Sequence, residues 1–291
     1  MHSNLKIGFI GAGMVGQSLS QYLYRHQYAI SGFLNSAHGQ PEVASQVVKA
    51  KTFLNYQQLA RASDWIFLTV PDDEIPNLAQ QISPYLTQHQ VLLHCSGIQS
   101  SAVLYQTTSP AYDYCSLHPA AIFSDNQTEL AKTLFTIEGP AATVHQVKAV
   151  LSMLPNLIQT IDPQQKAKYH AACVFSSNFV NSLMLNSQKL LQEIGADNQF
   201  ADRLILSLIQ QQLERIQKQG VKKALTGPIR RGDFTTIKNH LTALDPQAAR
   251  LYQLLSLTLL HTCATDLPLE KKELITQELF NEKYSEDFPR I

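Results

Sequence analysis

Short apolar runs alternate with helical stretches through the first half of the chain. The run 64–70 is almost wholly apolar, which is typical of a parallel strand covered on both faces, and it ends at Pro71. Weaker runs predict further strands at residues 6–10, 29–34, 52–54, 91–95, 112–117, 134–137 and 157–161. Helical stretches between them, such as 17–26 and 56–61, complete a βαβ alternation. This order predicts an α/β fold with a doubly wound parallel sheet.

The pattern changes at Asp162-Pro163, after which no strand is predicted. Long helical stretches follow instead, at residues 164–194, 197–219 and 246–265. An Asp before a Pro favours a helix start, because the Asp caps the first turn and the Pro fits its first position. We therefore expect two domains, an α/β domain over residues 1–162 and an all-helical domain over residues 163–291.

A glycine signature directly follows the first predicted strand. The run is Gly11-Ala12-Gly13-Met14-Val15-Gly16. In such a signature the first glycine permits a tight turn, the second lets the backbone approach a pyrophosphate, and the third lets the helix pack on the sheet. The helix that follows points its free N–H groups at the phosphates. The run therefore predicts a dinucleotide site; a glycine-rich turn that binds nothing is the alternative.

The residues after the second predicted strand set the expected cofactor. An acidic residue about 20 positions past the glycines usually binds the ribose hydroxyls of NAD, but here the run is Leu34-Asn35-Ser36-Ala37-His38. Without a carboxylate nothing there repels a 2′-phosphate, so NADP is favoured over NAD. Asn35 and Ser36 are predicted to bind that phosphate, although no Arg is present to clamp it. An ordinary polar loop is the alternative.

The loops after the run 64–70 and after 91–95 are expected at the carboxyl edge of the sheet, where ligands bind in this architecture. They read Val70-Pro71-Asp72-Asp73 and His94-Cys95-Ser96-Gly97. Val70, Pro71, Ser96 and Gly97 are predicted to lie along the nicotinamide ribose. The two aspartates are predicted to cap the next helix. For His94, a role facing the ligand and a structural hydrogen bond are both open.

Two histidines are candidates for proton transfer. His118 precedes Pro119, which biases it towards an extended backbone at the end of a strand, and imidazole suits proton transfer near neutral pH. His170 belongs to a polar stripe at helical spacing that also includes Lys166, Cys173, Ser177 and Asn181, with Asn178 at its border. We expect this stripe to line an interdomain cleft. For His118 the alternative is a structural histidine, and for the stripe it is a solvated helix face.

A turn-rich segment, 225–233, lies between two helical stretches of the second half. Asp233 is predicted to cap the helix that begins near Phe234. Arg230 and Arg231 are candidates for holding a carboxylate or phosphate, and ordinary surface arginines are the alternative.

Composition narrows the class of protein. The 291 residues include 23 basic and 23 acidic side chains, so the charge balance gives no sign of a nucleic-acid partner. The four cysteines show no spacing typical of a metal site or a disulfide framework, which favours a reducing compartment. No apolar run approaches the roughly 18 residues of a membrane span, and the first strand begins too early to leave room for a signal peptide. We expect a cytoplasmic protein without metal or membrane partners.

Together these motifs resemble the Rossmann-like proteins that carry a C-terminal domain of unknown function, DUF2520, and are described as NADP oxidoreductases. The matching segments are 11–16, 70–73, 94–97, 117–119, 169–172, 177–178, 225–228 and 231–233. That family is similar to 6-phosphogluconate dehydrogenase-like enzymes, including pyrroline-5-carboxylate reductase, ketopantoate reductase and F420-dependent NADP reductase. The resemblance implies a Rossmann domain followed by an all-helical domain of the 6-phosphogluconate dehydrogenase type, which often forms the dimer.

One departure from those relatives limits what the resemblance implies. The β-hydroxyacid dehydrogenases carry a catalytic Lys one turn before an Asn, whereas here Lys166 comes one turn before His170. Their mechanism is therefore not carried over to this chain.

The sequence thus predicts an NADP-dependent oxidoreductase that transfers a hydride to or from a small carbonyl, imine or alcohol, as a homodimer. His170 is the first candidate for the acid/base and His118 the second. Asn178 and Ser177 would orient the substrate, and Lys166 and Arg231 would bind it. The alternatives are an NADP-binding sensor without turnover and a reductase linked to F420 or flavin.

Overall fold

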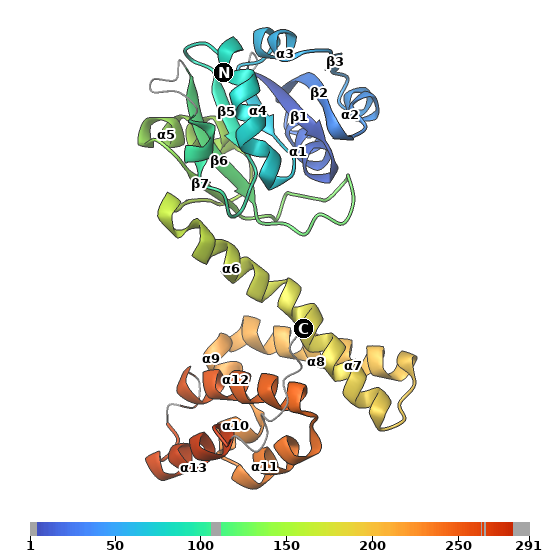
Figure 1. The fold of residues 1–291 in the computed structure, drawn as a ribbon, viewed down its shortest axis with the longest axis vertical. Coiled ribbons are helices and arrows are strands. Elements are labelled where there is room, and N and C mark those ends of the chain that lie inside the picture. The colour runs from blue at the N-terminus through green and yellow to red at the C-terminus, as the bar shows by residue number, and fades with distance from the viewer. Residues whose placement is uncertain (1–4, 106–111, 263, 265, 282–291) are drawn as a thin grey trace. The chain divides into compact units, whose positions relative to one another are not determined.

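The structure, a computed structural model, describes residues 5–105, 112–262, 264 and 266–281, and the side chains of residues 35–39 also lie outside the description. The chain forms two compact units, Met1–Phe179 and Val180–Ile291 (Figure 1). The first is an α/β unit and the second is helical. The division predicted between residues 162 and 163 would place the helix that starts at Lys166 in the second part, whereas contacts group it with the first.

The first unit contains one eight-stranded sheet with the order β3-β2-β1-β4-β5-β6-β7-β8 (Figure 1). Neighbouring strands are parallel except for β6 and β7. The predicted α/β fold class is thereby confirmed, with one antiparallel pair that the sequence did not predict. The strands are β1 Lys6–Ala12, β2 Ala29–Gly39, β3 Lys51–Phe53, β4 Trp65–Leu68, β5 Val91–His94, β6 Asp113–Pro119, β7 Phe135–Glu138 and β8 Ile158–Thr160.

The direction of β7 follows from its connection. A parallel neighbour would require a crossover, usually through a helix. The segment between β6 and β7 contains no helix, so the chain returns antiparallel, with Ser116 opposite Glu138 and His118 opposite Thr136.

Helices cover both faces of this sheet. Successive residues of β4 alternate between two cores: Trp65 and Phe67 pack with α1 and α5, while Ile66 and Leu68 pack with α3 and α4. This is why β4 is apolar throughout and buried along its whole length. The helices of this unit are α1 Met14–Arg25, α2 Pro41–Val47, α3 Tyr56–Ala62, α4 Ile75–Ile82, α5 Ala141–Val150 and α6 Lys166–Ser176. The short 3-10 helices are η1 Asp72–Glu74, η2 Ser83–Tyr85, η3 Ser101–Leu104, η4 Leu151–Met153 and η5 Pro163–Gln165.

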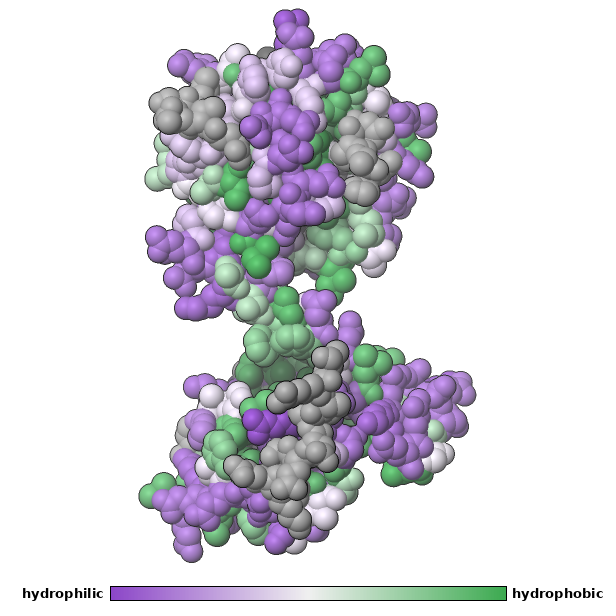
Figure 2. Space-filling view, viewed as in Figure 1, coloured by the Kyte–Doolittle hydropathy of each residue, from purple (hydrophilic) through white to green (hydrophobic). Residues whose placement is uncertain are grey.

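The prediction of one continuous helix over residues 164–194 is wrong. The structure has two helices, α6 and α7 (Asn178–Glu193), separated at Ser177. The Ser177 hydroxyl donates to the Cys173 carbonyl at 2.7 Å, a bond back along the helix that competes with the helical ladder. The polar stripe is therefore continuous only as far as Cys173. Figure 2 shows hydrophobic surface along α6.

The second unit has its own apolar core, which α10 to α13 supply. Asp233 accepts a hydrogen bond from the Thr236 amide at 3.1 Å, which confirms the predicted cap of α11. By contrast, α7 has no buried residue and α8 has only Ala201 and Ile205. The helices are α8 Asn198–Gln219, α9 Val221–Ala224, α10 Gly227–Arg231, α11 Phe234–Ala243, α12 Pro246–Thr262 and α13 Leu269–Leu279. Within the described residues, no helix has the length and apolar character needed to cross a membrane.

Candidate functional site

The glycine signature forms the turn between β1 and α1, and two of its glycines are needed for the turn itself. Gly11 has φ +99°, and a Cβ there would lie 2.5 Å from the Thr69 carbonyl. A Cβ on Gly16 would lie 2.4 Å from the Gly11 carbonyl. Thr69 also donates its hydroxyl to that carbonyl at 2.7 Å, which ties the turn to the end of β4. Both positions therefore exclude a side chain for reasons of internal packing.

Gly13 has no such internal reason. Its φ is −78°, which any residue adopts, and a Cβ built on it would meet no atom of the described residues within 4 Å. The space it leaves belongs to a groove of about 340 Å³ on this edge of the sheet. The groove is lined by Gly13, Met14, Val15, Thr69, Val70, Pro71, Asp72, Cys95 and Ser96. Gly13 thus leaves backbone open towards the groove, as close approach of a pyrophosphate requires.

The predicted ribose-binding segment falls in the last part of β2. β2 continues to Gly39, and Gly39 pairs with Ala12 of the glycine turn. The pairing with β1 is irregular here, because it passes from the pair Ile10 and Leu34 directly to the pair Ala12 and Gly39 and leaves residues 35–38 without partners in the ladder. The side chains of Asn35 and Ser36 are outside the described part of the chain, and their contact with a 2′-phosphate stays a prediction.

The loops after β4 and β5 are joined at the groove. Gln99 donates its side-chain amide to the Asp72 carbonyl at 2.6 Å, and the Ser96 hydroxyl accepts from the backbone amide of Gln99 at 2.9 Å. The predicted capping by Asp72 and Asp73 is wrong, because the cap positions of η1 and α4 are Pro71 and Glu74 and neither makes a side-chain cap bond. Both aspartates are exposed at this edge instead.

The contacts of His94 favour a structural role. His94 is fully buried, and its Nδ1 accepts a hydrogen bond from the Ser96 amide at 3.1 Å. Since a backbone N–H can only donate, Nδ1 carries no proton. Burial, followed by the charge of Lys166, lowers the pKa of His94 to about 3. The ring is therefore neutral at pH 7 and supports the loop after β5.

A row of buried polar residues crosses three adjacent strands. His94, Ser116 and Glu138 are paired in register on β5, β6 and β7, and each is at most 1% exposed. Lys166, from the first turn of α6, inserts its ammonium group here with 2% of its side chain exposed. Its Nζ donates to the Ser96 carbonyl at 2.7 Å and to the Ser116 hydroxyl at 2.5 Å, and lies 3.6 Å from Glu138 Oε1. These contacts favour a positioning role for Lys166 over direct contact with substrate.

Glu138 is held on its other side by the segment after β5. Its Oε1 accepts from the Ser101 amide at 2.6 Å and its Oε2 from the Ser101 hydroxyl at 2.8 Å. The buried carboxylate thus has a charge partner and two donors, as a buried ion pair requires. Burial lowers the pKa of Lys166, and the carboxylate of Glu138 opposes that shift.

The two predicted histidines meet around Gly97. A Cβ on Gly97 would lie 2.7 Å from His170 Cδ2 and 3.0 Å from His118 Nε2. His118 Nδ1 is hydrogen-bonded to the Tyr169 hydroxyl at 2.7 Å. Burial, then the charge of Lys166, lowers the pKa of His118 to about 4, while burial raises that of Tyr169 to about 12. At pH 7 both groups are neutral, and the side chains of His118, Tyr169 and His170 are all partly exposed.

The other predicted residues are not part of this cluster. Ser177 follows His170 by seven residues, or about 10 Å along a helix axis, and its hydroxyl bonds to Cys173 and Asn178. Arg231 belongs to the second unit, with Nη2 3.7 Å from Asp233 Oδ2. The roles of Ser177, Asn178 and Arg231 stay predictions.

The sequence interpretation missed Glu138 and assigned no role to Tyr169. A signal for Glu138 is present, because polar residues alternate on both strands: Ser116 and His118 on β6, and Thr136 and Glu138 on β7. Alternation places each pair on one face of the sheet, and the antiparallel register brings the two pairs together.

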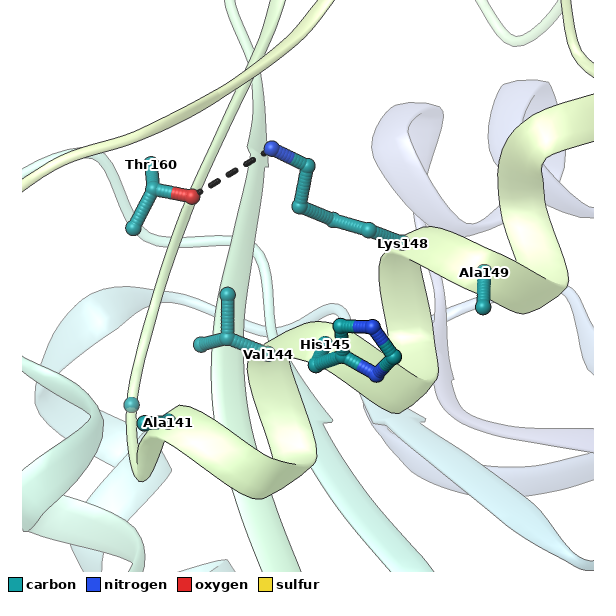
Figure 3. A pocket seen from close by; sticks show the side chains of 7 residues that line it. Ala141, Val144, His145, Lys148, Ala149 and Thr160 are labelled. Carbon is teal, nitrogen blue, oxygen red and sulfur yellow. Dashed lines mark hydrogen bonds between the residues drawn. The ribbon is translucent and has the colours of Figure 1, made fainter.

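A larger hollow of about 540 Å³ lies elsewhere in the first unit, between α5 and β8 at the edge of the sheet. In Figure 3, Lys148 reaches from α5 towards Thr160, to which its Nζ donates at 3.4 Å, and His145 stands on the same helix. The rest of the lining is Gly139, Ala141, Val144 and Ala149. None of the residues predicted for the site lies here.

Comparison with known families agrees with the motifs. A Rossmann-like domain matches residues 1–119, and a domain of unknown function, DUF2520, matches residues 133–259. The second match begins before β7, so it includes the last two strands of the sheet as well as most of the helical part. No curated protein sequence matches the chain.

Similar solved structures include the putative NADP oxidoreductase BF3122 from Bacteroides fragilis, at 26% identity and a TM-score of 0.71, with 90% of this chain and 100% of that one covered. Protein TM1727 from Thermotoga maritima is 24% identical with a TM-score of 0.70, covering 89% and 98%. Pyrroline carboxylate reductase from Plasmodium falciparum, solved with NADP bound, is 15% identical with a TM-score of 0.56, covering 98% and 100%. The resemblance predicted from the motifs is confirmed: this chain carries a Rossmann-like domain followed by a DUF2520 domain.

Proposed function

We propose that this protein is an NADP-dependent oxidoreductase that transfers a hydride between the nicotinamide and a small carbonyl, imine or alcohol. The observation that carries the proposal is Gly13, whose missing side chain leaves space in the groove that none of the described side chains fills. Backbone exposed at a helix N-terminus suits a pyrophosphate, because the dipole and the free N–H groups favour negative charge there. The similarity to BF3122, which is named a putative NADP oxidoreductase, supports the same activity.

The residues along the groove match successive parts of such a cofactor. Gly13, Met14 and Val15 would hold the pyrophosphate, and Val70, Pro71, Ser96 and Gly97 would border the nicotinamide ribose. Bound NADPH would supply the hydride, so the protein needs only to orient the reactants and to move a proton. The thiol of Cys95 also lines this groove, and burial raises its pKa to about 12, which keeps it protonated.

His170 is the proposed acid/base, and His118 supports it. Because burial lowers the pKa of His118 to about 4, its ring is neutral at pH 7 and is a poor proton donor. It can accept a hydrogen bond, and Tyr169 fixes its ring. His170 is partly exposed and lies against Gly97, which borders the proposed nicotinamide position. Lys166 would act by holding the Ser96 carbonyl.

The finer predictions rest on the sequence together with this site. NADP is proposed over NAD because the chain lacks an acidic residue at positions 34–38. A homodimer through the helical part would cover the exposed apolar side chains of α7 and α8, such as Leu185 and Leu208, which are 64% and 57% exposed. The domain division at residue 162 and a cytoplasmic location stay predictions.

The test of the proposed cofactor site is Gly13→Ala. The new methyl group has free space and an allowed backbone, so the thermal midpoint without ligand should stay within about 2 °C of the wild type. It would nevertheless occupy the pyrophosphate position, and NADPH affinity should fall at least about 10-fold. We would measure thermal midpoints and NADPH fluorescence titrations for both proteins, with NADH and F420 as further ligands.

Three results are informative in that experiment. A wild-type shift with NADPH that exceeds the shift with NADH supports the proposed cofactor. A larger shift with F420 would favour the F420-linked alternative. No shift with any of the ligands would remove the basis of the proposal.

A further inference from the structure

The segment between β6 and β7 folds back against the first helix of the sheet. It follows Pro119 directly, and Figure 1 shows it as a long green loop that reaches towards α1. Ser18 accepts a hydrogen bond from the Thr128 amide at 3.1 Å, and Gln21 donates to the Asn126 carbonyl at 3.0 Å. These residues are more than 100 positions apart along the chain, so the contacts are tertiary.

Gln17 connects this segment to the glycine turn. Its side chain is 7% exposed and lies in the second turn of α1. The amide Nε2 donates to the Ala12 carbonyl at 2.7 Å, and Oε1 accepts from Asn126 Nδ2 at 3.0 Å. The amide of Gln17 is thereby fixed at both ends, and its orientation follows from these partners, since only Nε2 can donate to a carbonyl.

The Ala12 carbonyl belongs to the peptide that ends at the Gly13 nitrogen. In a trans peptide the N–H points opposite to the C=O in a rigid plane. A hydrogen bond that holds the Ala12 carbonyl towards Gln17 therefore turns the Gly13 N–H to the other side of the peptide. The Gln40 amide also donates to this carbonyl, but at 3.5 Å, so Gln17 supplies the shorter of the two bonds. Without Gln17 the peptide would be held less firmly, because the glycine next to it restricts the backbone least.

We propose that Gln17 and Asn126 form a clamp that holds the Ala12–Gly13 peptide in the orientation required to bind the pyrophosphate of the dinucleotide. The inference rests on the proposed function and adds two positioning residues to it, one of them from the segment that follows His118. The apolar residues of α1 that face the sheet are Leu19, Tyr22 and Leu23. Gln17, Ser18 and Gln21 are buried although they are polar, and the segment that covers them supplies their partners.

Gln17→Met tests the clamp, because it keeps an unbranched side chain of similar size and removes both hydrogen bonds. Gln21→Met is the matched control. Gln21 is also 7% exposed and also bonds to Asn126, but its side-chain amide donates to the Asn126 carbonyl, whereas that of Gln17 donates to the Ala12 carbonyl. NADPH dissociation constants would be measured by fluorescence at fixed salt, together with the urea midpoint of each protein.

We expect Gln17→Met to weaken NADPH binding about 5- to 10-fold, because the free energy of one hydrogen bond corresponds to a factor of roughly 2 to 10 in affinity. Gln21→Met should weaken it less than about 2-fold. The urea midpoint should fall by a similar amount in both variants. Asn126→Ala, at an exposed position that folding tolerates, should weaken binding about 2- to 5-fold. Unchanged affinity in Gln17→Met, or equal losses in both glutamine variants, would overturn the clamp while leaving the proposed function intact. A wild type that does not bind NADPH would overturn both.

Discussion

The buried pair of Lys166 and Glu138 leads to a prediction that one single variant and one double variant can test. Nζ and Oε1 are 3.6 Å apart, and the side chains are 2% and 1% exposed. Removing one partner of such a pair leaves an uncompensated buried charge, which costs about 3–5 kcal/mol of unfolding free energy. Lys166→Met should therefore destabilise the first unit by that amount.

Removing both charges should cost less than removing one. In the double variant Lys166→Met/Glu138→Gln no buried charge remains, and the amide oxygen introduced at position 138 can still accept the Ser101 amide bond. What is lost is the donor to the Ser96 carbonyl and the Ser116 hydroxyl, or about 1–3 kcal/mol. Adding Glu138→Gln to Lys166→Met should thus restore at least about 1 kcal/mol of stability.

The assay is urea unfolding at pH 7 followed by tryptophan fluorescence. The chain has a single tryptophan, Trp65, which is 1% exposed in β4 and therefore reports on the first unit alone. With a slope near 2 kcal/mol/M, Lys166→Met should lower the midpoint by about 1.5–2.5 M. A double variant that is less stable than Lys166→Met, or a single variant with the wild-type midpoint, would refute the ion-pair reasoning.

Two further predictions concern the histidines. The folded-state pKa of His94 is about 3, below the 6.5 of an unfolded chain, so the unfolded state binds the proton more readily and stability should fall as pH drops below about 6.5. His94→Gln keeps an acceptor for the Ser96 amide but does not titrate. Between pH 7 and 5, the free energy of unfolding of this variant in urea should depend on pH less steeply than that of the wild type, by up to about 1.4 kcal/mol per pH unit. Equal slopes in the two proteins would contradict the buried neutral imidazole. Once a substrate is found by NADPH absorbance, His170→Ala should lower kcat by about 10²- to 10⁴-fold with NADPH affinity retained. Undiminished turnover would reject His170 as the acid/base.

Local patterns were sufficient for the strands and for the glycine turn. The apolar run that became β4 and the signature at residues 11–16 depend on neighbouring residues alone, and the structure has both. His118 and His170 were also identified as candidates, and they meet at Gly97. Each of these features can be recognised within a short window of sequence.

Features that depend on distant residues were missed. The roles of Glu138 and Gln17 come from partners 37 and 109 positions away, which periodicity does not indicate. The break at Ser177 was missed for a different reason, because a serine inside a helical pattern can either bond back to the helix or face solvent. The direction of β7 depends on the absence of a helix in the segment before it.

The position of β7 and β8 bears on how this chain could be divided. The two matched families meet between residues 119 and 133, which lies inside the sheet and before its last two strands. A fragment that ends at this point would expose the edge of β6 and would lose both Glu138 and Lys166, the partners of the buried polar row. The family boundary is therefore not a folding boundary. An exchange of nucleotide-binding modules between such proteins would have to cut after α6, so that the whole sheet and Lys166 are inherited together.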